Sequence, residues 1–163
     1  MGDVEGAEVT EVLDPSLTGL EQLRALFGED GPGVGITRLL GITTDALEEG
    51  MVAFGVEPRP DMCNPAGIVH GGIAATLLDS AMSCAIHSTL QVGERYTTVD
   101  LHVHYTRPIR PDHGHIVATG TVVHRGARVG TAEGRLVDAE GKVLAHGTTT
   151  CLVMPPSFSA GVS

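Results

Sequence analysis

One uninterrupted segment limits what this chain can fold into. Residues 70–90, HGGIAATLLDSAMSCAIHSTL, contain no proline and are rich in alanine and leucine. At 1.5 Å per residue this segment predicts a helix about 30 Å long. Apolar side chains occur on nearly every side of the helix, which is the pattern of a helix buried on most of its surface. The remainder of the chain must therefore enclose it.

The segments that follow this helix alternate between apolar and polar residues, which predicts strands. We expect them at 97–107, 115–125, 129–138 and 142–154, separated by turns that contain proline or glycine. Because the connections are short, consecutive strands should pair as an antiparallel meander. In the first strand the alternation puts Val99, Leu101, Val103 and Tyr105 on one face and Asp100, His102, His104 and Thr106 on the other.

The segments that precede the long helix predict one helix and two strands. The expected helix has Asp14 as its cap, Pro15 at its first position and the capping box Thr18-x-x-Glu21, and it ends in the glycine-rich cluster 28–33. Residues 34–57 predict two antiparallel strands joined at Glu48-Glu49-Gly50, and 59–67 a loop. The predicted fold class is therefore α+β, with one curved antiparallel sheet wrapped around one central helix.

Length and charge point to one domain. The 163 residues suffice for one core, and we expect an acidic flexible leader at 1–13, the domain at 14–154 and a flexible tail at 155–163. The net charge of −10 argues against a nucleic-acid binder. Three cysteines are too few for a disulfide framework, and neither a signal peptide nor an apolar run of membrane-spanning length is apparent. We expect a cytoplasmic protein that binds no membrane.

The long helix carries one acid, Asp79. At 100° per residue Gly72, Thr76, Ser83 and His87 share its face, so a polar stripe runs along an otherwise apolar helix. A carboxylate in a buried helix is costly unless it is hydrogen-bonded, and its pKa tends to rise toward values useful to a base or nucleophile. Asp79 is therefore the first candidate for chemistry, although a purely structural hydrogen-bonding role fits equally well at this point.

The start of the same helix is a second candidate. In Asn64-Pro-Ala-Gly-Ile-Val-His70-Gly71-Gly72 a loop ends in two glycines where the helix begins. The free N–H groups of a helix N-terminus can stabilise an oxyanion that develops on a carbonyl, and glycine leaves room for a substrate. A tight turn alone would also explain the glycines.

Together these residues resemble a known signature. The pattern N-x5-H-G-G-x6-D, formed by Asn64, His70, Gly71, Gly72 and Asp79, is similar to that of the hotdog-fold thioesterases, particularly the PaaI-like group of the phenylacetate pathway. The resemblance covers about residues 14–154. It implies the hotdog fold and hydrolysis of an acyl-coenzyme A thioester in a homodimer whose two sheets join, with each site shared between the chains and a dimer of dimers expected.

The resemblance also implies roles for individual residues. Gly71 resembles the oxyanion-hole donor, and Asn64 and His70 the residues that orient the thioester carbonyl or the attacking water. Asp79 resembles the nucleophile or general base, Ser83 a hydroxyl that positions the acid or water, and Thr98 a polar group from the neighbouring strand. The resemblance implies neither a metal nor an organic cofactor. Coenzyme A enters only as part of the substrate.

Coenzyme A carries phosphate charges, which an acidic protein has to accommodate locally. Residues 95–128 contain five arginines and two acids. Arginine side chains match phosphate oxygens well. The candidates for contact with the phosphates lie at strand ends or turns: Arg107, Arg110, Arg125 and Arg128.

Several alternatives stay open at the level of sequence. The pairs His102/His104 and His113/His115, with His124, could suggest a metal site, but no carboxylate or cysteine stands at a matching spacing and we expect none. No G-x-S-x-G elbow or phosphate loop is present, which disfavours serine hydrolase chemistry. The remaining alternatives are an enoyl-thioester hydratase or dehydratase of the same fold and a non-catalytic acyl-CoA binding module.

Overall fold

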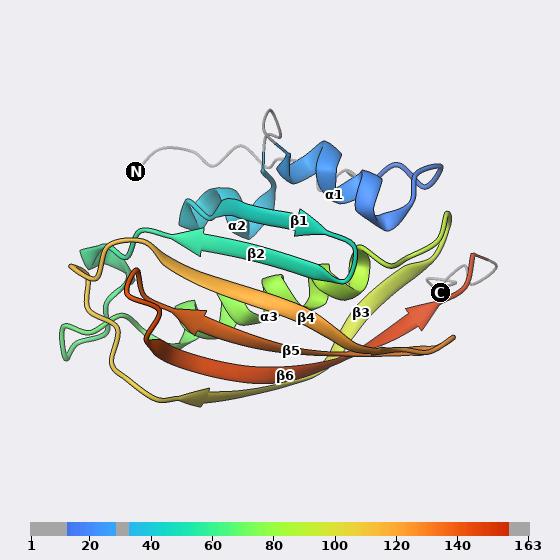
Figure 1. Cartoon of the computed structure of the whole chain (residues 1–163). Helices are drawn as coiled ribbons and strands as arrows, with labels where there is room; N and C mark the ends of the chain where they lie inside the picture. The colour runs from blue at the N-terminus through green and yellow to red at the C-terminus, as the bar shows by residue number, and fades with distance from the viewer. Residues whose placement is uncertain (1–12, 29–32, 157–163) are drawn as a thin grey trace, which may run out of the picture.

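A six-stranded antiparallel sheet curves around one long helix in the computed structural model, which describes residues 13–28 and 33–156 (Figure 1). The helix is α3 (Gly71–His87). The sheet has the order β1-β2-β4-β5-β6-β3. Its strands are β1 (Thr43–Glu48), β2 (Met51–Val56), β3 (Arg95–Tyr105), β4 (Ile116–Arg125), β5 (Val129–Val137) and β6 (Val143–Met154). The predicted α+β class, with the sheet wrapped around one helix, is confirmed.

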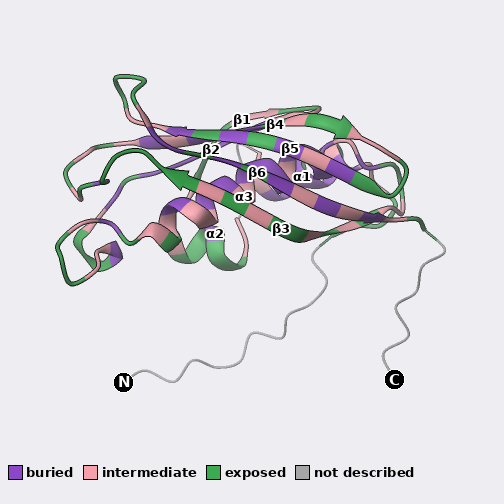
Figure 2. Cartoon of the chain, turned by 90° about the horizontal axis from the view of Figure 1, so that it is seen from below, coloured by how far each residue is buried: buried purple, intermediate pink, exposed green. Residues whose placement is uncertain are grey.

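The core lies between α3 and the inner face of the sheet (Figure 2). The sheet-facing side of α3 is fully enclosed, with Leu77, Leu78, Ala81 and Met82 each 0% exposed. Burial of these side chains is worth roughly 25 cal/mol per Å² of apolar area. The helix predicted from its composition as buried is therefore the element around which the core forms.

Glycines in the sheet let α3 come unusually close to it. A Cβ added to Gly120 of β4 would lie 2.4 Å from the backbone of Ala81 and 2.5 Å from the Cα of Met82. At Gly134 of β5 an added Cβ would meet the Met82 side chain at 2.8 Å, and at Gly130 the Ile86 side chain at 2.8 Å. Backbone thus packs on backbone at Gly120, and side chains fill the space on either side.

The strand order corrects one expectation. Strands β4, β5 and β6 form the predicted meander, but β3 pairs with β6 rather than with β4, which follows it in the chain. The segment between β3 and β4 therefore crosses to the other side of β5 and β6. Strand β3 becomes an edge of the sheet, with one side of its backbone unpaired among residues 13–28 and 33–156.

The N-terminal elements also differ from expectation. Helix α1 (Gly19–Phe27) begins after Thr18, whose side chain and that of Glu21 form the complete capping box. The expected cap Asp14 instead accepts hydrogen bonds from the N–H and hydroxyl of Ser16, at 2.9 and 2.6 Å, in a separate turn. The expected start at Asp14 and Pro15 is wrong because the reciprocal box at Thr18 satisfies the first free N–H groups of the helix.

The segment 34–57 contains a helix that the sequence pattern did not predict. Residues expected to open the first strand form α2 (Gly35–Leu40), and β1 starts only at Thr43. Ile36 and Leu39, whose apolar character suggested the strand, are exposed. The predicted turn at Glu48-Glu49-Gly50 is confirmed, with Gly50 at a φ of +78°, a conformation that favours glycine.

The expected loop at 59–67 contains one short 3₁₀ turn (Pro60–Met62). Most of the predicted leader 1–13 and tail 155–163 lies outside the described residues. No helix in the described part of the chain is long and apolar enough to cross a membrane.

The close approach at Gly120 gives a direct test of the core. We expect Gly120→Ala to lower the free energy of unfolding by about 3 kcal/mol, because helix backbone cannot move aside as a side chain can. Chemical denaturation measures this change. Thr121→Val, on the next and outward-facing residue of β4, is the matched control and should change stability by less than about 0.5 kcal/mol. Equal stability of the Gly120→Ala variant and the parent would show that α3 and β4 do not approach as described.

Candidate active site

The N-terminus of α3 is built by a histidine cap and a glycine pair. The N-cap is His70, whose Nδ1 accepts a hydrogen bond of 2.9 Å from the N–H of Gly72. Gly71 is the first helical residue, so its N–H has no acceptor one turn earlier in the helix. A donor backed by the dipole of a 17-residue helix is thus available at Gly71.

The loop before α3 is held in place by backbone hydrogen bonds. The N–H of Val69 donates to the Ile109 carbonyl and that of His70 to the Met62 carbonyl, each at 2.8 Å. Asn64 closes a turn in which its Oδ1 accepts from the N–H of Ala66 at 2.9 Å. This bond leaves the amide NH₂ of Asn64 as the part of its side chain that can meet a ligand.

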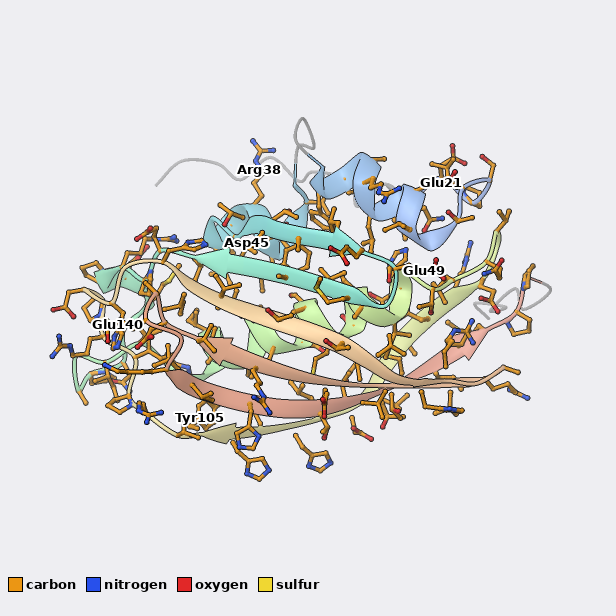
Figure 3. The ribbon with its side chains drawn as sticks, viewed as in Figure 1. Glu21, Arg38, Asp45, Glu49, Tyr105 and Glu140 are labelled. Atoms are coloured by element: carbon orange, nitrogen blue, oxygen red, sulfur yellow. The ribbon has the colours of Figure 1, made fainter. Side chains whose placement is uncertain are left out.

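A pocket of about 360 Å³ lies beside this helix end. Its lining includes Asn64 and Gly71 from the loop and helix, and Tyr105, Arg107 and Ile109 from the end of β3 and the segment after it. Tyr105 lies at the end of β3 (Figure 3). Its hydroxyl donates to the Gly71 carbonyl at 3.0 Å, and its ring covers the Cα of Gly71, where a Cβ would meet it at 3.2 Å. The period-two pattern places Tyr105 only on an apolar strand face and carries no signal for this contact.

Asp79 lies in the middle of α3, on the flank of the helix next to β3. It is half-buried, and its Oδ1 accepts a hydrogen bond of 3.2 Å from the Thr98 hydroxyl. Burial raises the pKa of the Asp79 carboxyl above its ordinary value, while the Thr98 hydrogen bond acts in the opposite direction. A carboxylate with a raised pKa is a stronger base than a solvated one.

Thr98 reaches Asp79 because of a β-bulge. The register between β3 and β6 shifts between Thr98 and Asp100, which leaves Val99 as the extra residue. Regular alternation would place Thr98 on the same outer face as Asp100 and His102. The bulge changes the phase, so Thr98 faces α3, and Val99, which the alternation grouped on one face with Leu101, is 58% exposed.

Ser83 lies one turn beyond Asp79 and is buried. Its hydroxyl donates to the Ser80 carbonyl at 3.5 Å, a long bond within the same helix. Behind Thr98, the Sγ of Cys151 lies 3.9 Å from the threonine hydroxyl oxygen. The acid, Thr98 and Ser83 thus form one group on the flank of α3.

The predicted site residues fall into two groups within the chain. Asn64, His70 and Gly71 gather at the N-terminus of α3, whereas Asp79, Ser83 and Thr98 gather at its middle. Gly71 and Asp79 are eight residues apart on one helix, or about 12 Å along its axis. The pocket at Gly71 does not extend to Asp79.

The four candidate arginines also divide between two ends of the sheet. Arg107 lines the pocket and donates to the Val143 carbonyl at 2.5 Å, and the exposed Arg110 pairs with Asp112 at 3.0 Å. Arg125 pairs with Glu94 at 2.5 Å, and the exposed Arg128 follows in the turn between β4 and β5. Arg107 is the one of the four that lines the pocket beside Gly71.

The histidine pairs have other partners. His104 stacks on His146 with 5.1 Å between ring centroids, and His115 bonds to Asp45 at 2.9 Å. The Nδ1 of His113 accepts from the N–H of Arg110 at 2.8 Å. Among residues 13–28 and 33–156 no three histidine, cysteine or acidic side chains are arranged to hold a metal ion.

Comparison with known proteins agrees with this fold. The model of the thioesterase superfamily matches residues 66–145. A Halobacterium salinarum protein described as an esterase is 36% identical over 104 residues, which cover 61% of this chain and 67% of that protein. Human acyl-coenzyme A thioesterase 13 is 30% identical over 115 residues, covering 69% of this chain and 81% of that enzyme. The structure of Escherichia coli PaaI, from the phenylacetic acid degradation operon, superposes with a TM-score of 0.72 at 22% identity and covers 86% of this chain and 96% of that one.

A curved antiparallel sheet around one helix is the hotdog fold, and the relatives described as an esterase and an acyl-coenzyme A thioesterase identify the class as thioester hydrolases. The chain belongs to the thioesterase superfamily.

The raised pKa of Asp79 predicts how stability depends on this residue. Above its folded-state pKa the ionised, half-buried carboxylate destabilises the native state, and this cost disappears as the pH falls through the raised pKa toward the ordinary value of 3.8. We therefore expect Asp79→Asn to be more stable than the parent at pH 7, because the amide oxygen can still accept from Thr98. The difference should shrink as the pH approaches 4.

Urea unfolding at both pH values measures this effect. Asp100→Asn, which alters an exposed acid on the same sheet edge, should not stabilise the protein. A loss of stability in Asp79→Asn at pH 7 would contradict the assigned environment of the acid.

Proposed function

We propose that this protein hydrolyses an acyl-coenzyme A thioester to the free acid and coenzyme A, with Asp79 as nucleophile or general base. The observation that carries the proposal is the placement of the one acid of α3: half-buried, bonded to Thr98 and raised in pKa. The second support is Gly71, the first residue of α3, which lines the pocket and has an N–H without an acceptor in the helix.

The chemistry requires few groups. The Asp79 carboxylate attacks the thioester carbonyl carbon, or removes a proton from a water that attacks it, and the carbonyl oxygen becomes an oxyanion. The N–H of Gly71 and the dipole of α3 stabilise that oxyanion. The carbon–sulfur bond then breaks and the thiolate of coenzyme A leaves. If Asp79 attacked directly, water hydrolyses the resulting anhydride and restores the carboxylate. No metal or organic cofactor takes part.

The remaining site residues orient the reactants. The NH₂ of Asn64 can donate to the thioester carbonyl or to water, because its oxygen is already bonded to Ala66. The Nδ1 of His70 is occupied by the N–H of Gly72, so Nε2 is the atom available to a ligand. Ser83 and Thr98 hold the acid and the water beside it. Arg107, which lines the pocket, is the first candidate for a phosphate of coenzyme A, followed by Arg110, Arg125 and Arg128.

A homodimer supplies what one chain lacks. Since Gly71 and Asp79 are about 12 Å apart on one rigid helix, they cannot act on one carbonyl within a single chain. Strand β3 is an edge of the sheet that exposes Val99 and Tyr105, 58% and 55% accessible, and such an edge can pair with a second copy. Two-fold antiparallel pairing of β3 would join the sheets and place the α3 N-terminus of one chain beside the helix of the other. Two such dimers are expected to associate. The three free thiols support a reducing compartment, the cytoplasm.

Hydrolysis of an acyl-CoA panel, followed by thiol release, tests the activity. We expect turnover by the parent and a loss of at least about a hundredfold in kcat for Asp79→Asn, because the general base or nucleophile is removed. Asp100→Asn should keep the parental rate. Absence of thiol release by the parent, or full activity in folded Asp79→Asn, would refute the mechanism. Loss of an enoyl thioester without thiol release would identify a hydratase, and acyl-CoA binding without turnover a binding module.

Mixed dimers test whether the site is shared. We co-express Asp79→Asn and Asn64→Ala chains with different tags and purify the mixed species through both. If the two groups of residues meet across the interface, one of the two sites in each mixed dimer is intact, and about half of the parental activity should return. Mixed dimers no more active than the two parent variants would place both groups of residues in the same chain's site.

A further inference from the structure

Helix α1 contacts α3 through a buried polar pair. Gln22 of α1 and His87 at the end of α3 are 7% and 4% exposed, and the His87 Nε2 lies 2.8 Å from the Gln22 Oε1. The Gln22 Nε2 donates to the carbonyls of Asp14 and Leu17, at 2.7 and 3.3 Å, so the orientation of the amide is fixed. Burial lowers the pKa of His87 to about 4, so the neutral ring donates from Nε2 to the Gln22 oxygen.

The packing around this pair is too close to be incidental. A Cβ on Gly19 would lie 1.8 Å from the His87 carbonyl oxygen, and the N–H of Gly19 donates to the Leu90 carbonyl at 2.9 Å. Helix α1 therefore sits directly on the last turn of α3. A buried amide and imidazole cost free energy that apolar side chains would not, unless their hydrogen bonds are fully made.

The contacts continue from His87 toward the acid. The Tyr96 ring meets His87 edge-on, with 5.1 Å between centroids and 61° between planes. Burial raises the pKa of the Tyr96 hydroxyl, and the nearby Ser83 side chain, as a hydrogen-bond partner, acts in the opposite direction. Tyr96 and Thr98 both precede the bulge in β3, so both face α3, where Thr98 meets Asp79 and Tyr96 meets Ser83 one turn further on.

We propose that Gln22, His87 and Tyr96 form a brace through which α1 positions Ser83 beside Asp79. These three are positioning residues, and the brace rests on the proposed thioesterase function of Asp79. The model of the superfamily matches residues 66–145, which contain His87 and Tyr96 but not Gln22 of α1. With Tyr96 held between His87 and Ser83, the Ser83 hydroxyl stays directed along the face of α3 that carries the acid.

Kinetics of single and double variants test the brace. Tyr96→Phe removes the hydroxyl and keeps the ring on His87. We expect it to lower kcat about tenfold with KM changed less than twofold, because Ser83 loses its orientation while the substrate contacts remain. Ser83→Ala should lower kcat to a similar extent, and the double variant no further, since Tyr96 acts through Ser83. Effects that multiply, or an unchanged kcat in Tyr96→Phe, would overturn the proposal.

Gln22→Leu extends the test to α1. We expect Gln22→Leu to lower kcat as much as Tyr96→Phe does. The assay is run at a temperature at which thermal denaturation shows that the variant is folded. Leu23→Ala, which removes a buried apolar side chain from the same helix, is the matched control for lost stability and should keep its kcat in the folded state. An equal kcat loss in Leu23→Ala would show that any destabilisation of α1 lowers kcat, and the proposed positioning role of Gln22 would be wrong.

A readout that does not need activity separates the brace from the proposed function. In the ¹H–¹⁵N spectrum, Gln22→Leu should shift the signals of Ser83 and Asp79, whereas Arg24→Ala, on the exposed side of α1, should not. If the parent cleaves no thioester but these signals shift, the proposed function fails and the brace stands. If the shifts stay confined to α1 and His87, the brace is wrong whatever the activity.

Discussion

The structure depends on backbone packing directly on backbone where α3 crosses the sheet. At Gly120 no side chain separates β4 from Ala81 and Met82 of α3, and Gly130 and Gly134 accommodate larger helix side chains on the next strand. Contact this close fixes the rotation of α3 about its own axis, because Leu77, Leu78 and Ala81 have to face the sheet. With that rotation set, Asp79 can lie only on the flank of the helix beside β3. The position of the acid is thus a consequence of how the core is packed.

The electrostatic character of Asp79 depends on a local irregularity in the neighbouring strand. Without the extra residue Val99, Thr98 would face outward and the acid would lose its hydroxyl donor. Full burial would keep the carboxyl protonated, whereas full exposure would leave it a weak base. Half-burial and one hydrogen bond place it between these limits. The same bulge turns Tyr96 toward α3, so a single inserted residue brings two side chains of β3 to the helix.

The fold followed from sequence wherever local pattern decides structure. The apolar helix at 70–90, the strand segments after it and the Thr18–Glu21 box are all signalled by neighbouring residues and are confirmed. The sequence pattern did not predict that β3 pairs with β6 or that Val99 forms a bulge. Both features depend on contacts between residues about 50 positions apart in the chain, and period-two alternation carries no information about such contacts. The site divides in the same way. Asn64, Gly71 and Asp79 stand out by residue type and spacing, whereas Gln22, Tyr96 and Tyr105 act through tertiary contacts and carry no local signal.

The two ends of α3 are supported by different parts of the chain. On the proposed mechanism, the oxyanion donor and the acid have different roles, and they lie at different places along this helix. The N-terminal end, which presents the Gly71 N–H, is held by the loop through Val69 and His70 and covered by Tyr105. The C-terminal end is held by α1 through Gln22 and His87. On the proposed mechanism the oxyanion donor and the acid that act together come from different chains. Each active site then depends on the loop of one chain, which positions Gly71, and on α1 of the other chain, which packs against the helix that carries Asp79. These two parts come together only when β3 of one chain pairs with β3 of the other.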